Sequence, residues 1–231
     1  GCAGAPSPRA WMGLDDRFVT SLSSGLGSRE DGITTPPPRT WRFVSENGSP
    51  TDTLLQTRRG KMAVKSIDRG FRVRTVPFTR ATKFARGPDD RLYTGWSDSL
   101  RIEAHAVDGS TETVADVPTP PVSVTEAERD SALNEMSSDL QSIAAPAIPE
   151  TKPAFTDFAV AADGRLWVRR PATGKSAETV SWWILAPETK TIHEVRLPRE
   201  VVIEVIQNGR AYGRTTTEMG APAVVRYRIE S

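Results

Sequence analysis

The stretch Asp163-Gly164-Arg165-Leu166-Trp167 decides the fold, because its pattern of a tight turn, an arginine and apolar residues occurs four times along the chain. The other copies are Asp15-Asp16-Arg17-Phe18-Val19, Asp89-Asp90-Arg91-Leu92-Tyr93 and Asn208-Gly209-Arg210-Ala211-Tyr212. The arginines stand at 17, 91, 165 and 210, so two intervals of 74 residues are followed by one of 45. Self-similarity of this kind is the signature of a repeat architecture.

Each copy has the features of a β-hairpin. Asp-Gly and Asn-Gly are strong hairpin signals, because a type I′ turn needs positive φ at both central residues. The position seven residues before each arginine suits a buried incoming strand and is held by Ala10, Phe84, Phe158 and Ile203. Further extended runs follow each hairpin, at 41–45, 101–107, 180–185 and 223–229, and a fourth strand follows the first three. The shortest interval, 45 residues, is therefore that of one four-stranded propeller blade.

The repeat predicts an all-β propeller after a short N-terminal tail or linker at 1–8. We expect blades at about 9–77, 78–121, 153–200 and 201–231, with a helical insertion at about 122–152. A jelly roll or sandwich would also supply short strands, but not four similar hairpins in tandem. The alternating residues at 62–76 predict an extra hairpin that turns at Asp68-Arg69-Gly70, and 23–39 reads as a surface loop.

One helix is predicted over about 123–143. Leu133, Met136, Leu140 and Ile143 follow one another at helical spacing and form a single apolar stripe. Thr125 and Glu128 form the pattern of a capping box at the start, and Pro146 lies just past the end. We expect this helix to pack as a lid on one face of the sheets.

Composition excludes several classes of function. Thirty basic and 29 acidic residues give a net charge of +1, which argues against a nucleic-acid binder. The sequence has no apolar run of the roughly 18 residues that a membrane-spanning helix needs. Its only cysteine is Cys2 and its only histidines are His105 and His193, which excludes an internal disulfide, a cysteine-rich zinc site and a three-histidine metal centre.

Three stretches carry a family resemblance. They are Val76-Pro77-Phe78 before the second repeat copy, Glu126-Ala127-Glu128-Arg129 in the insertion, and Lys152-Pro153-Ala154-Phe155 before the third copy. In these stretches the chain resembles a bacterial group of extracytoplasmic six-bladed β-propellers, related in architecture to NHL-repeat and TolB-like proteins. The resemblance implies a shape and an extracytoplasmic compartment rather than a reaction.

The resemblance leaves two points open. The four units match the C-terminal part of a six-bladed pattern, so either two blades precede them or the chain closes as a smaller ring. An unclosed arc would expose a blade face and strand edges, which a partner, a second copy or the missing half would cover. Cys2 after Gly1 is compatible with a mature bacterial lipoprotein, and an arbitrary chain start with a free thiol is the alternative.

The sequence points to no catalytic residue, no metal site and no cofactor. His105 and His193 are each interpreted as exposed strand residues, and the sequence has no nucleophile elbow, phosphate loop or His-Glu-x-x-His motif. The acidic pairs Asp15-Asp16 and Asp89-Asp90 supply too few oxygen donors for a calcium loop and are interpreted as turn residues. The repeat arginines are interpreted as exposed residues with cross-strand partners.

The candidate binding residues lie where the second strand leaves each hairpin. If these strand ends reach one face of the ring, Trp96, Arg169, Arg170 and Arg214 would crowd one mouth of the central channel. Guanidinium groups beside an aromatic ring suit an anionic or carbohydrate-like ligand, whereas solvated strand ends are the alternative. Trp182 and Trp183 face opposite sides of one strand, so we expect one in the core and the other on the surface or in a groove.

The leading hypothesis is a non-enzymatic extracytoplasmic binding or scaffold module. Its partner would be a protein or a small anionic or carbohydrate-like ligand, with no nucleic acid, and with membrane contact only through a lipid anchor at Cys2. The alternatives are a subunit of a larger membrane-associated assembly and a propeller lyase or hydrolase with a channel-bound metal.

Overall fold

The computed structural model describes residues 11–14, 17–22, 25, 30–45, 47–174, 177–186 and 191–229. The chain forms two compact units. Unit 1 comprises Gly1–Thr82, Val107–Gly109 and Pro121–Pro153, and unit 2 comprises Lys83–Ala106, Ser110–Pro120 and Ala154–Ser231. The expectations for Cys2, the tail at 1–8, Ala10 and the Asp15-Asp16 turn lie outside the described residues.

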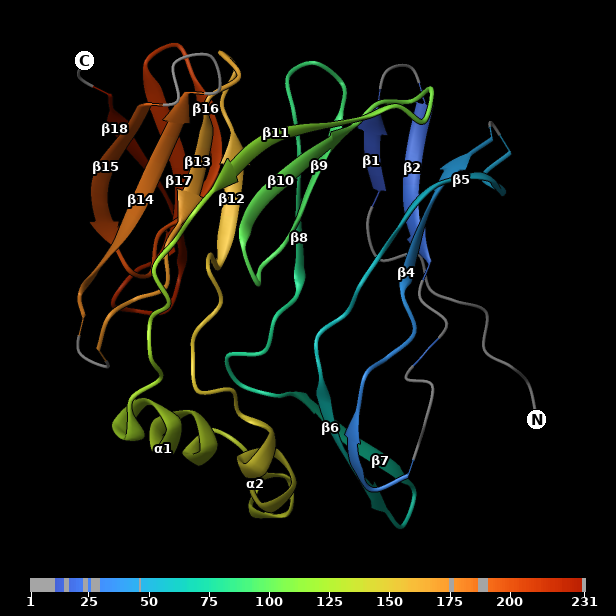
Figure 1. The fold of residues 1–231 in the computed structure, drawn as a ribbon, viewed down its shortest axis with the longest axis vertical. Coiled ribbons are helices and arrows are strands. Elements are labelled where there is room, and N and C mark those ends of the chain that lie inside the picture. The colour runs from blue at the N-terminus through green and yellow to red at the C-terminus, as the bar shows by residue number, and fades with distance from the viewer. Residues whose placement is uncertain are drawn as a thin grey trace. The chain divides into compact units, whose positions relative to one another are not determined.

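Unit 2 contains three antiparallel sheets among its described residues, and each follows the order of the chain (Figure 1). The first is the blade of β8 (Thr82–Arg86), β9 (Leu92–Trp96), β10 (Leu100–His105) and β11 (Thr111–Val117). The second is the blade of β12 (Asp157–Val160), β13 (Leu166–Arg169), β14 (Thr179–Ala186) and β15 (Thr191–Pro198). The third is the blade of β16 (Val202–Gln207), β17 (Arg210–Thr216) and β18 (Pro222–Arg228).

Adjacent blades of unit 2 are held together by two apolar cores. One core joins blade β8–β11 to blade β12–β15 and includes Phe155 and Ile102, and the other joins blade β12–β15 to blade β16–β18. Trp182 is fully buried in the second core, while Trp183 packs against the first. The expectation that the two tryptophans face opposite sides is confirmed. Trp183 is half-buried against the first core, because β14 has a blade on each of its faces.

The turn geometry follows the sequence only in part. Asn208 (φ 51°) and Gly209 (φ 67°) are both left-handed between paired Gln207 and Arg210, which is the predicted two-residue type I′ turn. In the third copy only Gly164 has positive φ, and the Ala161 N–H donates to the Arg165 carbonyl at 2.8 Å, which closes a loop of three residues. The predicted tight turn between two strands is present in that copy, but its type I′ geometry was wrong, since a three-residue loop does not need two left-handed residues.

Unit 1 contains two sheets in its described part. One has the order β1 (Trp11–Leu14), β2 (Arg17–Leu22), β4 (Arg39–Val44) and β5 (Pro50–Thr57). The other has the order β3 (Gly32–Thr34), β6 (Met62–Ile67) and β7 (Gly70–Thr75). The predicted extra hairpin is confirmed, because β6 and β7 pair up to Ile67 and Gly70. Strand β3 lies within 23–39 and pairs with β6, so the prediction of a surface loop over all of that stretch was wrong.

The insertion forms two helices instead of the single one predicted. Helix α1 (Glu126–Asn134) begins with the predicted capping box of Thr125 and Glu128, which is confirmed. Residues 135–137 are not helical. Helix α2 (Ser138–Ala144) follows them and is continued directly by the short 3-10 helix η1 (Ala145–Ala147). Leu140 and Ala144 pack on Ala63 of β6, so the insertion covers a sheet of unit 1 as expected.

The fold is therefore all-β and of the propeller type, with one helical insertion. Three of its blade sheets have four strands in meander order, and blade β16–β18 has three among the described residues. In the part of the chain that the structure describes, no helix is long and apolar enough to cross a membrane.

Candidate functional site

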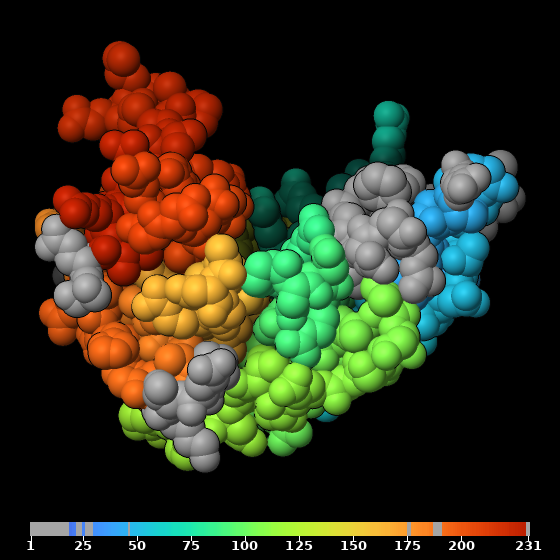
Figure 2. All heavy atoms as spheres, turned by 90° about the horizontal axis from the view of Figure 1, so that it is seen from above, coloured from blue at the N-terminus to red at the C-terminus, as the bar shows by residue number. Residues whose placement is uncertain are grey.

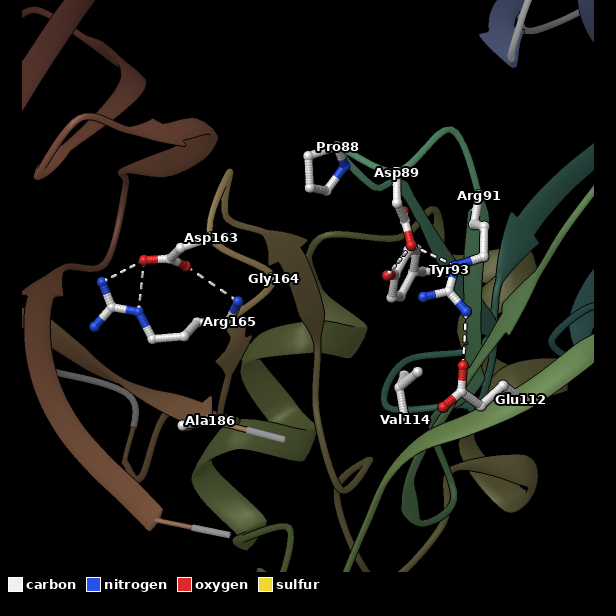
Figure 3. Close-up of a pocket in the computed structure, with 10 residues that line it drawn as sticks. All are labelled: Pro88, Asp89, Arg91, Tyr93, Glu112, Val114, Asp163, Gly164, Arg165 and Ala186. Carbon is white, nitrogen blue, oxygen red and sulfur yellow. Dashed lines mark hydrogen bonds and ion pairs between the residues drawn. The ribbon is translucent and has the colours of Figure 1, made fainter. Parts of the chain in front are cut away.

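A pocket of about 350 Å³ lies in unit 2 between the second and third repeat turns. Blade β8–β11 contributes Asp89, Arg91, Tyr93 and Glu112, and blade β12–β15 contributes Asp163 and Arg165 (Figure 3). In Figure 2 the yellow residues of the β12–β13 turn lie beside green residues of blade β8–β11. The pocket thus gathers the repeated Asp and Arg positions of two neighbouring blades.

On one wall, Arg91 lies between two carboxylates. Its Nε donates to Asp89, and its Nη1 donates to Glu112 Oε2 at 2.7 Å. The Tyr93 hydroxyl also donates to Asp89 Oδ2 at 3.0 Å, and the Arg91 guanidinium lies 5.7 Å from the centroid of the Tyr93 ring. Four polar side chains are therefore fixed in one connected network.

On the opposite wall, Arg165 folds back onto its own turn (Figure 3). Its Nε and Nη2 lie 2.9 and 2.7 Å from Asp163 Oδ2, and its backbone N–H donates to Asp163 Oδ1 at 3.1 Å. The same residue pair, an aspartate two positions before an arginine, makes the ion pair in both turns. In the fourth copy Asn208 replaces the aspartate, so that turn lacks this ion pair.

These contacts shift the pKa values of several pocket residues away from the ordinary ones. Burial acts to raise the pKa of Asp89, but hydrogen bonds from Arg91 and Tyr93 outweigh it and the pKa is lowered. The hydrogen bond from Arg165 lowers the pKa of Asp163. Burial and the hydrogen bond to Asp89 raise the pKa of Tyr93 to about 12, and the bonds to Glu112 and Asp89 raise that of Arg91.

Sequence reasoning had not selected these residues for a site. The repeat arginines are predicted to be exposed and to have cross-strand partners. Arg91 does pair with Glu112 of β11, but Arg91 and Arg165 are half-buried and also pair with aspartates of their own turns. The signal was present in the sequence as the recurring Asp-x-Arg spacing. What the sequence did not contain was the proximity of two such turns in neighbouring blades.

Arg169 and Arg170, predicted for the channel mouth, have partners within unit 2. The guanidinium of Arg170 lies 4.3 Å from the centroid of the Trp183 ring and donates to the carbonyl of Ala154. Arg169 donates to the carbonyl of Arg199. Burial lowers the pKa of both arginines. Arg170 is thereby buried, with only 7% of its surface exposed.

Arg214 and Trp96 are more accessible. Arg214 is exposed, and its Nε donates to Glu204 Oε1 at 2.6 Å. Trp96 is half-buried at the end of β9. A mouth shared by these two residues with Arg169 and Arg170 stays a prediction.

The two histidines have different environments. His193 is exposed on β15, as expected. His105 is half-buried, contrary to expectation, because its ring bridges Thr94 (2.8 Å) and Thr111 (3.1 Å) on the two neighbouring strands. Burial lowers its pKa. Within the described ranges, no three His, Cys, Asp or Glu side chains are grouped as metal ligands.

Comparison with known proteins finds distant structural similarity. No model of a protein family matches the chain, and no curated protein matches it. A streptogramin B lyase structure is similar with 12% identity and a TM-score of 0.39, over 99% of this chain and 71% of that chain. A catalytically inactive virginiamycin B lyase from Staphylococcus aureus, with quinupristin, is similar with 14% identity and a TM-score of 0.31, over 93% and 63%. A selenomethionine-substituted virginiamycin B lyase from the same organism has 12% identity and a TM-score of 0.33, over 92% and 74%. The assignment of the propeller-type fold rests on the strand order and blade packing described above.

Proposed function

We propose that this chain is a non-enzymatic binding module of the propeller type, and that its ligand site is the pocket between the second and third repeat turns. The observation that carries the proposal is the convergence of two repeated Asp-x-Arg turns and Tyr93 on one pocket. Its volume of about 350 Å³ falls in the range of small-molecule sites. The ion pairs fix these side chains before a ligand arrives, which reduces the entropy lost on binding.

The chemistry of the lining favours a small hydroxylated carboxylate such as a sugar acid. Among the described residues, Arg91 Nη2 and Arg165 Nη1 have no hydrogen-bond partner, so each arginine keeps donors for a ligand carboxylate. Asp163 offers acceptor oxygens to ligand hydroxyls, and Val114 and Ala186 add apolar lining. A ligand of this kind falls within the anionic or carbohydrate-like class predicted from the sequence, although that prediction concerned the channel mouth and not this pocket.

Calorimetric titration with glucuronate tests this proposal. We expect saturable binding by the unaltered protein and a loss of at least about tenfold in affinity in the Arg165→Gln variant, because one charge-assisted contact disappears. The matched control is Arg101→Gln, which removes an exposed arginine on β10 that pairs with Glu103 and Asp116 outside the pocket. Equal binding by the Arg165→Gln and Arg101→Gln variants would contradict the proposal, as would the absence of saturable binding by the folded protein.

The finer assignments are also proposals. The resemblance noted in the sequence supports membership of the NHL- and TolB-like six-bladed group, an extracytoplasmic location and a lipid anchor at Cys2. The intact mass of the protein from membrane and soluble fractions of its source tests the lipid anchor and the number of blades. A mass increased by a diacyl or triacyl group supports the anchor, and a mass larger by about two blades, roughly 90 residues, supports the six-bladed ring.

The lyase or hydrolase alternative has a channel-bound metal. In that case, adding divalent ions would raise the melting temperature.

A further inference from the structure

One face of blade β16–β18 carries a concentration of arginines. Residues that pair directly in an antiparallel sheet point to the same face, and Arg210 pairs with Arg228, Tyr212 with Arg226, and Arg214 with Val224. We call the surface formed by these six residues the arginine face. The alternate residues of the same strands, such as Ala211 and Val225, point to the opposite face and join the core with blade β12–β15.

The arginine face has a large excess of positive charge. Arg214 is paired with Glu204, whereas Arg210, Arg226 and Arg228 have no ion pair among the described residues. Arg210 and Arg228 lie directly opposite each other, and like charges in that arrangement destabilise a sheet. The net charge of the whole chain is only +1, so this cluster is a local concentration of charge that is unfavourable for folding. Locally unfavourable features of this kind are concentrated at functional sites.

Apolar side chains lie among these arginines. Val224 is 80% exposed, and Val205, which pairs with Tyr212, is 45% exposed. Tyr212 is half-buried between them and the arginines. The face therefore offers apolar contacts beside guanidinium groups, a mixture found in protein interfaces, where arginine and tyrosine are enriched.

Strand β18 is also an open edge. Within the described part of the chain it pairs with β17 alone, so the backbone groups on its other side have no strand partner. In Figure 2 its red atoms lie at one end of the blades of unit 2. An unpaired edge is a template for an added strand.

We propose that the arginine face and the edge of β18 bind an extended acidic segment of a protein partner, which adds to the sheet as a further strand. Its backbone would pair with β18, and its carboxylates on the arginine face would meet Arg226 and Arg228. Arginine suits this role because its planar fork binds carboxylates in bidentate geometry. The same charges disfavour pairing with a second copy of this edge, because like strands would bring arginines together.

A synthetic peptide of five Glu-Val repeats tests this proposal by fluorescence anisotropy. We expect saturable binding that weakens as salt is raised, and at least about a tenfold loss of affinity in the Arg226→Glu/Arg228→Glu variant. The control variant Arg101→Glu carries a charge reversal on a different blade and should bind like the unaltered protein. The melting temperature of each variant shows whether it is folded.

Three results would overturn the proposal. The first is undiminished binding by the folded double variant. The second is equal binding of a peptide in which every backbone amide is N-methylated, because neither edge of that peptide can donate hydrogen bonds to β18. The third is arginine-dependent binding of polygalacturonate that is as tight as that of the peptide, which would assign the face to an acidic polysaccharide. The Arg165→Gln variant should bind the peptide normally, so failure of the pocket proposal and failure of this one are distinguishable.

Discussion

Replacing Lys152 by methionine should destabilise unit 1 strongly, because it leaves a buried carboxylate without its cation. Lys152 Nζ lies 2.6 Å from Glu128 Oε1, and the two side chains are only 4% and 8% exposed. Glu128 is the third residue of α1 and the capping-box partner of Thr125. The ion pair thus ties the start of the helical insertion to the segment by which the chain leaves it.

The expected loss is about 3 kcal/mol. Breaking a buried ion pair by removing one partner costs about 3–5 kcal/mol. We place this pair at the lower end, because Glu128 Oε2 keeps the hydrogen bonds from the Thr125 backbone and hydroxyl, both 3.1 Å, and lies near a positive helix N-terminus. For a chain of this size, such a loss corresponds to a decrease of about 6–12 °C in melting temperature.

The pH dependence gives the prediction a second, independent readout. In the unaltered protein burial acts to raise the pKa of Glu128, but the bonds from Lys152 and Thr125 outweigh it and the pKa is lowered. The ion pair therefore contributes stability above the ordinary pKa of 4.5, and this contribution is lost as the pH falls through the lowered value. The difference in melting temperature between the Lys152→Met variant and the unaltered protein should accordingly become smaller at acidic pH.

Calorimetric melting at neutral and acidic pH measures both effects. The matched control is Arg72→Met, which breaks an ion pair with Asp139 in the same unit. The Arg72 side chain is 55% exposed, so this substitution should lower the unfolding free energy by less than about 1 kcal/mol. The double variant Lys152→Met/Glu128→Leu should recover most of the loss, since an apolar pair replaces the ions. The reasoning would be refuted if Lys152→Met lowered the melting temperature no more than Arg72→Met does. It would also be refuted if the loss caused by Lys152→Met were the same at acidic and neutral pH.

Two further predictions concern unit 2. A Cβ at Gly95 would lie 2.9 Å from both the Arg101 carbonyl oxygen and the Phe155 ring, so Gly95→Ala should reduce the unfolding free energy by about 1–3 kcal/mol in urea titrations; an unchanged midpoint would show that the blades separate easily. Burial raises the pKa of Asp157, so the folded state favours its protonated form and loses stability as the pH rises through that pKa. Asp157→Asn should therefore raise the melting temperature at pH 7 but not below pH 3.8, the ordinary aspartate value; a benefit that persists in acid would have another cause.

Local structure could be predicted where a few adjacent residues determine it. The capping box of Thr125 and Glu128 and the left-handed pair Asn208-Gly209 are confirmed, because each depends on contacts or dihedral angles within one turn. The single helix over 123–143 was wrong for a related reason. A stripe of apolar residues indicates which side is buried, and Met136 and Leu140 do face one core, but it does not report whether the backbone between them remains helical.

The sequence alone determined the strand-turn repeat, the propeller-type blades and the place of the insertion, because alternation and turn residues act over short distances along the chain. Only the tertiary structure decided which repeat residues lie close together and which stay exposed. It brought Arg91 and Arg165 to one pocket, buried Arg170 beneath Trp183, and left the arginines of blade β16–β18 exposed. The physical reason is that burial and ligand access depend on what packs against each face of a blade, which the pattern of residues along one strand does not report.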